Sequence, residues 1–475
     1  MPRPLLALLV VATLACPARA GALDDARAAA RARELPALVE LGTWCHQQKL
    51  FATRNALAER ILALDPGHVG AHRWLRHRLG PGGRWEVAER STPASDGAGT
   101  AAAIAEFPAV RTRLLGPIAS ALAEALQEHG ADASPGTLEE LRAEIVALAP
   151  DVAAYRAAHG ELETAQGWRL AESVRGAARR AELRSAATQA LAAVPEPTPF
   201  DVPSILQRNA LRWRVALETA HVRVLATTTL PEAQRTATAV EALPAYVRTA
   251  LGIDARHLPG YTVHALGGPD DANALLAVHP DVDARTREHW HSFSASWIGE
   301  TNAIATYHPD ARWRVESACA MALGVVLGTH YGIGPTRAPF AMDAVEKRLV
   351  WELVGTRVTF TRRVAEYADR AEEWAKVEEL PDARWYARAA ELLATLSEGD
   401  LAERMGRPLN ALDLDDSVLG NALAAYYVEG RPDECGAFLR ALGAGASPDD
   451  ALRKASSLDL RALRLRMQRW LAERN

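Results

Sequence analysis

Alternation of apolar and polar residues predicts a small β-sheet in the middle of this 475-residue chain. The strand candidates, in chain order, are residues 213–217, 222–226, 261–266, 294–297 and 302–307. A short turn at 218–221 joins the first two candidates into a β-hairpin. Residues 231–251 and 269–278 lie between candidates and have the apolar spacing of helices. We therefore expect a small mixed sheet with helices packed on it.

Outside this region, the apolar residues recur with the period of helices that bury one face. Before the sheet, the predicted helices lie around Leu38 to Cys45, at 53–64, at 69–79 and, as two or three helices, within 101–194. After the sheet, everything from Phe340 onward has a helical pattern. The expected fold class is therefore α+β and mostly helical.

Two segments of turn-forming residues divide the chain. Residues 91–100 are a linker of Ser, Gly, Ala and Pro, and Pro195 to Pro199 predict a rigid spacer. With the N-terminal segment described next, they predict a division into residues 1–20, 21–90, 91–200 and 201–475.

The N-terminal residues have the pattern of a secretory signal peptide. Arg3 supplies the positive charge, residues 5–15 the short apolar core, and Ala18 to Ala20 the small-residue cleavage site. A lipoprotein anchored through Cys16 is an alternative, although residues 13–15 fit the usual lipidation motif poorly. The apolar core is shorter than the ~20 residues of a membrane span. We expect an exported protein, periplasmic or extracellular, with no membrane span.

Charge and cysteine content argue against two broad classes of protein, nucleic-acid-binding proteins and disulfide-stabilised small domains. The formal net charge is −5 and no basic run with interleaved aromatic residues occurs, so we expect no nucleic-acid partner. Beyond the signal peptide only Cys45, Cys319 and Cys435 remain, and three cysteines so far apart make no disulfide framework. Nothing in the sequence sets an oligomeric state.

Residues 56–75 carry a short repeat-like motif, A-L-A-E-R-I-L-A-L-D-P-G-H-V-G-A-H-R-W-L. The Asp-Pro turn between two helices resembles tetratricopeptide repeats, and Gly80 to Glu89 resemble the strand-like tail that follows such repeats in exported proteins. At most one and a half repeats are present, whereas a solenoid needs about three. The resemblance implies a short docking or packing module in residues 21–90.

A second resemblance rests on three segments that follow the last strand candidates. They are V-E-S-A-C at 315–319 at the start of an apolar helix, H-Y-G-I-G-P at 330–335, and P-F-A-M-D-A-V at 339–345. This order is similar to the gluzincin zinc peptidases of the peptidase MA-like group, which carry H-E-x-x-H, a loop with a Tyr-Gly turn, and P-x-W-L-x-E-G-x-A. The resemblance covers residues 211–475 and implies two lobes, a small mixed sheet followed by helices.

The same resemblance implies that the zinc site is vestigial. Histidines four residues apart share one helix face and hold the zinc, while the glutamate between them polarises the bound water. Val315 stands at the first ligand position and has no lone pair. Cys319 and Asp343 stand at the second and third positions, where both side chains could bind zinc, and Glu316 stands at the general base. With two of three ligands left, we expect no bound cofactor and a pseudopeptidase.

A protein that has lost the metal can still bind a peptide or a protein in the inherited cleft. In active relatives, an edge strand just before the zinc helix pairs with the extended substrate by strand addition. In this chain that strand would be residues 302–307.

Two alternatives remain from the sequence. The first is an active zinc peptidase that uses Cys319, Asp343 and a distant histidine as ligands, with Glu316 as the base. The second is a non-enzymatic helical scaffold, because residues 315–327 also have the pattern of an ordinary buried helix face with cysteine as a small core residue.

Histidines elsewhere give weaker metal candidates. His289 and His291 share one face if extended, and His279 or His308 would complete a site, but a polar loop is the favoured interpretation. For His68, which lies four residues before another histidine, helix capping is favoured over metal binding.

Overall fold

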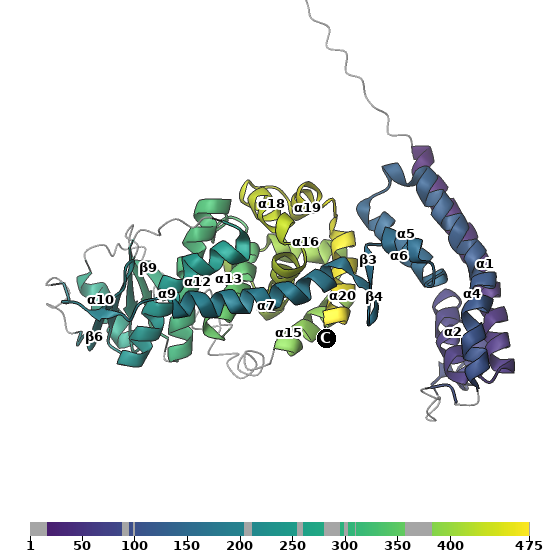
Figure 1. The fold of residues 1–475 in the computed structure, drawn as a ribbon, viewed down its shortest axis with the longest axis horizontal. Coiled ribbons are helices and arrows are strands. Elements are labelled where there is room, and N and C mark those ends of the chain that lie inside the picture. The colour runs from purple at the N-terminus through teal and green to yellow at the C-terminus, as the bar shows by residue number, and fades with distance from the viewer. Residues whose placement is uncertain are drawn as a thin grey trace, which may run out of the picture. The chain divides into compact units, whose positions relative to one another are not determined.

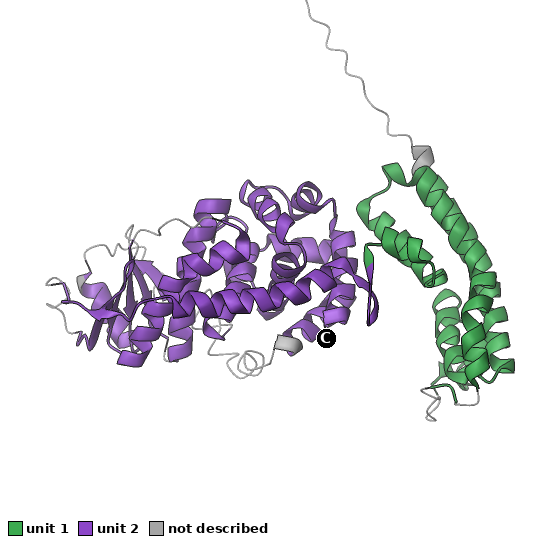
Figure 2. Cartoon of the chain, viewed as in Figure 1, with its two compact units in different colours: residues 1–161 green, residues 162–475 purple. Residues whose placement is uncertain are grey.

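The computed structural model describes residues 17–87, 95–97, 100–203, 211–253, 260–279, 295–298, 303–308, 310–356 and 382–474. The chain divides into two compact units, residues 1–161 and 162–475 (Figure 2). Each unit has hydrophobic clusters of its own. The boundaries expected at residues 90 and 200 mark changes in sequence character and stay predictions. Most of the expected signal peptide and Cys16 lie outside the described residues.

Unit 1 is built around two long helices, α1 and α4 (Figure 1). Its elements are α1 (Pro17–Gln47), α2 (Phe51–Leu64), α3 (Val69–Trp74), β1 (Arg78–Leu79), β2 (Trp85–Glu86), α4 (Ala101–His129), η2 (Gly130–Asp132), α5 (Pro135–Leu148) and α6 (Ala153–Ala158). Helix α1 packs against α2 and α4, and α4 packs against α5. Leu41, Ile61 and Leu122 belong to the buried cluster between them. The helical periodicity of this part is confirmed.

The helix expected at residues 69–79 is shorter than its pattern indicates. Helix α3 ends at Trp74, and the chain then forms the antiparallel pair β1 and β2. The ring of His72 stacks on Trp85 with 4.2 Å between ring centroids, and its Nε2 lies 2.8 Å from the carbonyl oxygen of Pro66. These tertiary contacts hold the hairpin against α3 and override the local helical spacing.

Unit 2 contains the sheet and most of the remaining helices. Its first part comprises β3 (Glu161–Thr164), β4 (Gly167–Leu170), α7 (Ala171–Ala192), β5 (Thr198–Pro199), β6 (Val215–Glu218), β7 (Val222–Ala226), α9 (Leu230–Leu251), β8 (Tyr261–Ala265), α10 (Pro269–Val278), β9 (Ala295–Ile298) and β10 (Ala303–Thr306). The β3–β4 hairpin was not expected from the sequence; Gly167, with φ 100°, begins β4 directly after the two-residue turn.

The sheet has six strands in the order β5-β6-β7-β8-β10-β9. Strand β8 pairs in parallel with β7 and β10, and the other pairs are antiparallel, so the predicted mixed sheet is confirmed. Two expectations need correction. Residues 302–307 are not an edge strand, because β10 lies between β8 and β9. The expected spacer at 195–199 contributes β5, an edge position that proline tolerates because one side of the strand makes no ladder hydrogen bonds.

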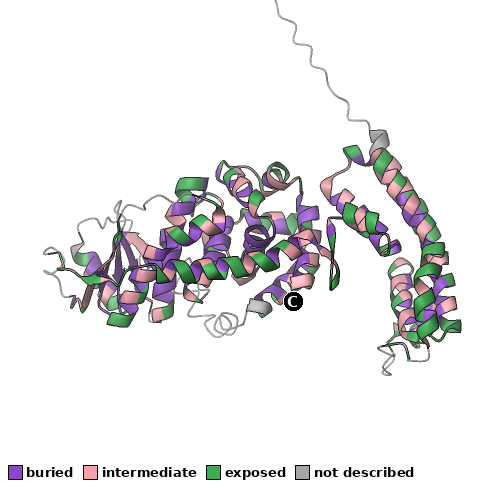
Figure 3. Cartoon of the chain, in the orientation of Figure 1, coloured by how far each residue is buried: buried purple, intermediate pink, exposed green. Residues whose placement is uncertain are grey.

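The sheet is covered on both faces. Val224, Val263 and Ile304 point to the face that packs on α9 and on α12 (Ala311–Tyr331). Leu225 and Ala305 point to the opposite face, in a cluster that includes side chains of α10. Figure 3 shows the sheet and the inner helices as largely buried. Helix α12 therefore starts against the sheet and continues into the helical lobe.

The rest of unit 2 is helical in the residues that the structure describes. Its elements are α13 (Pro339–Val354), α15 (Asp382–Thr395), α16 (Glu398–Gly406), η3 (Leu409–Ala411), α17 (Leu414–Ala425), the π-helix η4 (Tyr426–Gly430), α18 (Pro432–Gly443), α19 (Pro448–Ser456) and α20 (Leu460–Arg474). This order confirms a mostly helical α+β fold.

One buried ionic network joins η4 to α7, α13 and α20. Glu429 in η4 accepts hydrogen bonds from Arg348 of α13 at 2.8 Å and 3.0 Å, from Arg180 of α7 at 3.2 Å and from Arg474 of α20 at 3.1 Å. Burial acts to raise the pKa of Glu429, but the three guanidinium groups outweigh it and hold this pKa below its ordinary value. Glu429 is therefore ionised inside the core.

Candidate functional site

Helix α12 carries three of the four residues that the zinc-site resemblance singles out. It begins where Asp310 accepts a hydrogen bond from the N–H of Arg312 at 2.8 Å, and it ends at Gly332 with φ 71°. Val315, Glu316 and Cys319 are buried, and even the carboxylate-bearing Glu316 is only 2 % exposed. The sheet, α9, α13 and α18 all pack against this helix, which leaves these three side chains inside the core.

Burial also determines the chemical state of Cys319. It raises the pKa of the thiol well above its ordinary range, and the nearby Glu316 raises it further. The thiolate is the form that binds metals and attacks electrophiles. At neutral pH Cys319 is therefore a protonated thiol that packs as a small core residue.

Asp343, at the third ligand position, lies near the start of α13. Lys347, one turn further along, forms an ion pair with Oδ1, and the hydroxyl of Ser417 on α17 donates to Oδ2 at 3.4 Å. All three side chains are buried. The carboxylate is thus neutralised by a cation from its own helix, in the place where a metal ion would otherwise balance its charge.

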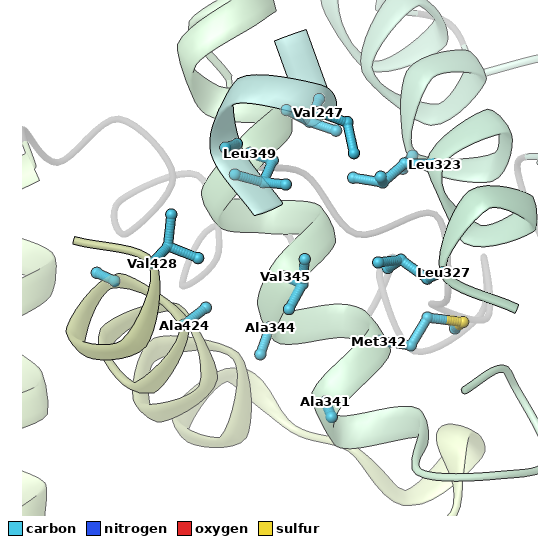
Figure 4. Close-up of a cluster of buried hydrophobic side chains, with 14 of the residues drawn as sticks. Val247, Leu323, Leu327, Ala341, Met342, Ala344, Val345, Leu349, Ala424 and Val428 are labelled. Atoms are coloured by element: carbon cyan, nitrogen blue, oxygen red, sulfur yellow. The ribbon is translucent and has the colours of Figure 1, made fainter. Parts of the chain in front are cut away.

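The pairing of α12 with α13 shows which of these residues meet. Figure 4 shows Leu323 and Leu327 of α12 facing Leu349 and Met342 of α13 in reverse order, so the two helices run antiparallel.

Glu346 of α13 fixes the register of this pair. A Cβ atom on Gly324 would lie 2.9 Å from Oε1 of Glu346, so these two residues lie opposite each other where the two helices are in contact. Cys319 lies five residues before Gly324 on α12, and Asp343 lies three residues before Glu346 on the antiparallel α13, so the two lie on opposite sides of this contact. At 1.5 Å per residue, they are separated by about 12 Å along the helix axes. The structure brings Glu316 and Cys319 together and holds Asp343 apart from them.

Glu346 itself is a buried acid that the sequence reasoning missed. Neither carboxylate oxygen accepts a hydrogen bond from any described residue. Burial raises its pKa well above the ordinary value of 4.5, and the negative charge of Asp343 raises it further against the opposing effect of Lys347. The available signal was an acidic residue three positions after Asp343, a spacing that places both carboxyl groups on one face of the predicted helix.

In the described part of the chain, no group of three or more His, Cys, Asp or Glu side chains is arranged to hold a metal ion. His68 caps α3, where its Nδ1 accepts from the N–H of Ala71 at 3.1 Å, which confirms the capping interpretation. The Nδ1 of His308 accepts from the N–H of Asp310 at 3.0 Å in the same way before α12. His289 and His291 lie outside the described residues.

His264 and His279 lie together on the α10 side of the sheet. Their ring centroids are 5.5 Å apart, and burial, with a smaller contribution from His279, lowers the pKa of His264 to about 3. Both ring nitrogens of His264 are buried and make no hydrogen bond with the described residues. His264 is therefore a neutral core histidine.

An open cavity lies at the opposite end of α12 from the sheet. It has a volume of about 570 Å³ and lies between the loop before α13, the end of α16 and the α18–α19 connection. The sequence reasoning did not predict it, because its walls come from three segments that are distant along the chain.

No protein-family model matches this chain, and neither curated proteins nor solved structures match it. Among the described helices, none is both long and apolar enough to cross a membrane. The three cysteines of the described chain are free and buried, which confirms the expected absence of a disulfide framework among them.

Proposed function

We propose that the protein is an exported, metallopeptidase-like binding protein that does not catalyse peptide hydrolysis. One observation carries the proposal: the residues at the ligand positions are closed inside the core. Val315 and Cys319 are buried on α12. Asp343 lies about two helical turns away from Cys319 along the helix axes and forms an ion pair with Lys347. A catalytic zinc site needs three protein ligands and an open position for water. Two separated ligands in a closed core supply neither.

The binding role is assigned to the edge of the sheet. Among the described strands β9 pairs only with β10, and it lies beside α12 as an edge strand would in a peptidase-like domain. Extended peptides bind such edges through main-chain hydrogen bonds. Ser296 and Trp297 at the centre of β9 are half-buried, so this edge retains access to solvent. This assignment replaces the expected edge at residues 302–307.

A casein experiment tests both parts of the proposal. Purified mature protein is expected to retain unfolded casein on a column and to leave it uncleaved, with or without a chelator, and to carry no stoichiometric zinc by elemental analysis. Alternate N–H groups of an edge strand point outward. Of the two variants Ser296→Pro and Trp297→Pro, at least one should therefore abolish casein retention.

The opposite outcome identifies the alternative with an altered zinc site. It would be about one zinc per chain together with chelator-sensitive cleavage, both lost in Cys319→Ser and Asp343→Asn. Cys435→Ser is the matched control, because Cys435 is an equally buried free cysteine on α18. Absence of casein retention in the native protein would refute the binding role, whatever the zinc content.

A further inference from the structure

The cavity at the far end of α12 has walls that are fixed by backbone contacts. A Cβ atom at Gly443 would overlap the carbonyl oxygen of Tyr331, so α12 and α18 meet there through a glycine. In the loop that follows α12, Gly334 and Arg337 exchange two backbone hydrogen bonds of 2.7 Å and 3.0 Å. Ala338 then takes φ 53°, a left-handed conformation that is rare for alanine and rarer before a proline. The cavity is therefore preformed.

Most of the cavity lining is apolar and poor in hydrogen-bond donors. Four prolines lie in its walls, and a proline has no backbone N–H to offer. The apolar residues of the lining include Pro335, Pro339, Pro408, Pro448, Leu409 and Leu442. Such a lining favours the hydrocarbon part of a ligand, because water that leaves this surface gives up few hydrogen bonds.

The two arginines of the cavity differ in their charge balance. Arg407 forms ion pairs with Asp413 and Asp416, both at 3.0 Å, so its charge is compensated. Arg337 donates from Nη1 to the carbonyl oxygen of Gly443 at 3.2 Å, and no carboxylate of the described chain pairs with it. An anchored guanidinium with unused donors therefore stands at the mouth of an apolar cavity.

A further source of positive potential lies beside this arginine. Helix α13 begins in the cavity wall at Pro339, and its N-cap residue Ala338 makes no side-chain capping hydrogen bond. The aligned peptide dipoles of a helix place partial positive charge at this end. The helix end supports the preference for an anion that Arg337 sets.

We propose that this cavity binds a small amphipathic monocarboxylate, with its hydrocarbon chain between the prolines and its carboxylate on Arg337. The volume of about 570 Å³ falls within the range of about 300–1,000 Å³ that is usual for small-molecule sites. A carboxylate matches the planar fork of a guanidinium by accepting two hydrogen bonds. The site lies away from β9 and does not depend on the function proposed for that edge.

Calorimetric titration with decanoate tests the proposal. We expect saturable binding of one decanoate per chain, and decanol should bind at least about ten-fold more weakly because it lacks the charge-assisted hydrogen bonds. Arg337→Gln should weaken decanoate binding by a similar factor. Arg235→Gln is the matched control, since Arg235 is an exposed arginine on α9, and it should leave the affinity unchanged.

A cavity-filling variant tests the location of the hydrocarbon chain. Ala446 is a half-buried lining residue, and Ala446→Trp should abolish decanoate binding while casein retention at β9 persists. Equal affinity for decanoate and decanol, or unchanged binding in both Arg337→Gln and Ala446→Trp, would overturn the proposal. Binding of a peptide with a C-terminal leucine in preference to decanoate would also overturn it, because the occupant would then be a polypeptide.

Discussion

Glu346 shows how burial alone can change the protonation state of a side chain. It has no hydrogen-bond partner among the described residues and lies against the backbone of α12 at Gly324. An ionised carboxylate in such a place would lose its hydration without compensation, so the folded protein holds the protonated form. Asp343, three residues away, keeps a cation beside it instead. Two acids on one helix thus differ in charge because only one has a partner.

Glu346→Gln should make the stability of the protein less dependent on pH. The folded pKa of Glu346 is raised, so its contribution is fully present below the unfolded value of about 4.5 and is lost as the pH rises. The free energy of unfolding of the variant should therefore rise relative to that of the native protein as the pH increases from about 4.5 to 8. Urea denaturation at several pH values measures the difference.

The control for this prediction is Glu391→Gln on α15. Glu391 is exposed, so its replacement should shift stability by less than about 0.5 kcal/mol at every pH. Parallel pH profiles for the native protein and Glu346→Gln would contradict the assignment of a protonated Glu346.

At the scale of elements, α12 and α18 cross in a close contact between their backbones. Gly443 ends α18 directly against the carbonyl group of Tyr331, and backbone lies on both sides of the contact. A side chain at this position cannot be accommodated by rotation of a neighbouring side chain. The two helices would have to move apart.

Gly443→Ala is therefore expected to destabilise the protein by about 1–3 kcal/mol, the usual cost of overpacking a core. Chemical denaturation of the full chain measures it. Gly406→Ala is the control, because a Cβ atom there meets nothing within 4 Å, and its effect should stay below about 0.5 kcal/mol. An equal effect of the two substitutions would show that helix propensity, and not the close contact, decides the outcome.

The local sequence pattern predicted the positions of helices and strands better than it predicted which elements lie next to each other. The spacing of apolar residues placed α9 and the β6–β7 hairpin nearly at their observed positions, because periodicity is a property of the segment itself. Strand order depends on contacts between segments, so the interior position of β10 and the pairing of Thr198–Pro199 as β5 were not predicted.

The residues of the candidate site show the same difference between local and long-range prediction. Glu316 and Cys319 were placed together correctly because residues three or four apart share a helix face. The distance to Asp343 depends on the register of α12 against α13, which no local spacing encodes. The partner of Asp343, Lys347, was within reach of the sequence, since a carboxylate and an amine four residues apart on a helix form ion pairs.

At the scale of the whole molecule, the two units are expected to unfold independently. Leu41 lies in the core of unit 1 and Leu463 in the core of unit 2, and both are fully buried leucines on helices. Each Leu→Ala substitution should cost about 2–5 kcal/mol in its own unit. Calorimetry should resolve two transitions, with Leu41→Ala lowering one and Leu463→Ala the other. A single transition lowered equally by both variants would show that the units unfold as one.

The network around Glu429 has a kinetic consequence. Its arginines come from positions 180, 348 and 474, so the network closes only after segments from opposite parts of unit 2 have docked. Contacts of such long sequence separation are made late, after the entropy of loop closure has been spent. Interactions that are absent from the transition state slow unfolding without speeding folding. We therefore expect Glu429 to lengthen the lifetime of the folded unit and to leave the rate at which it folds unchanged.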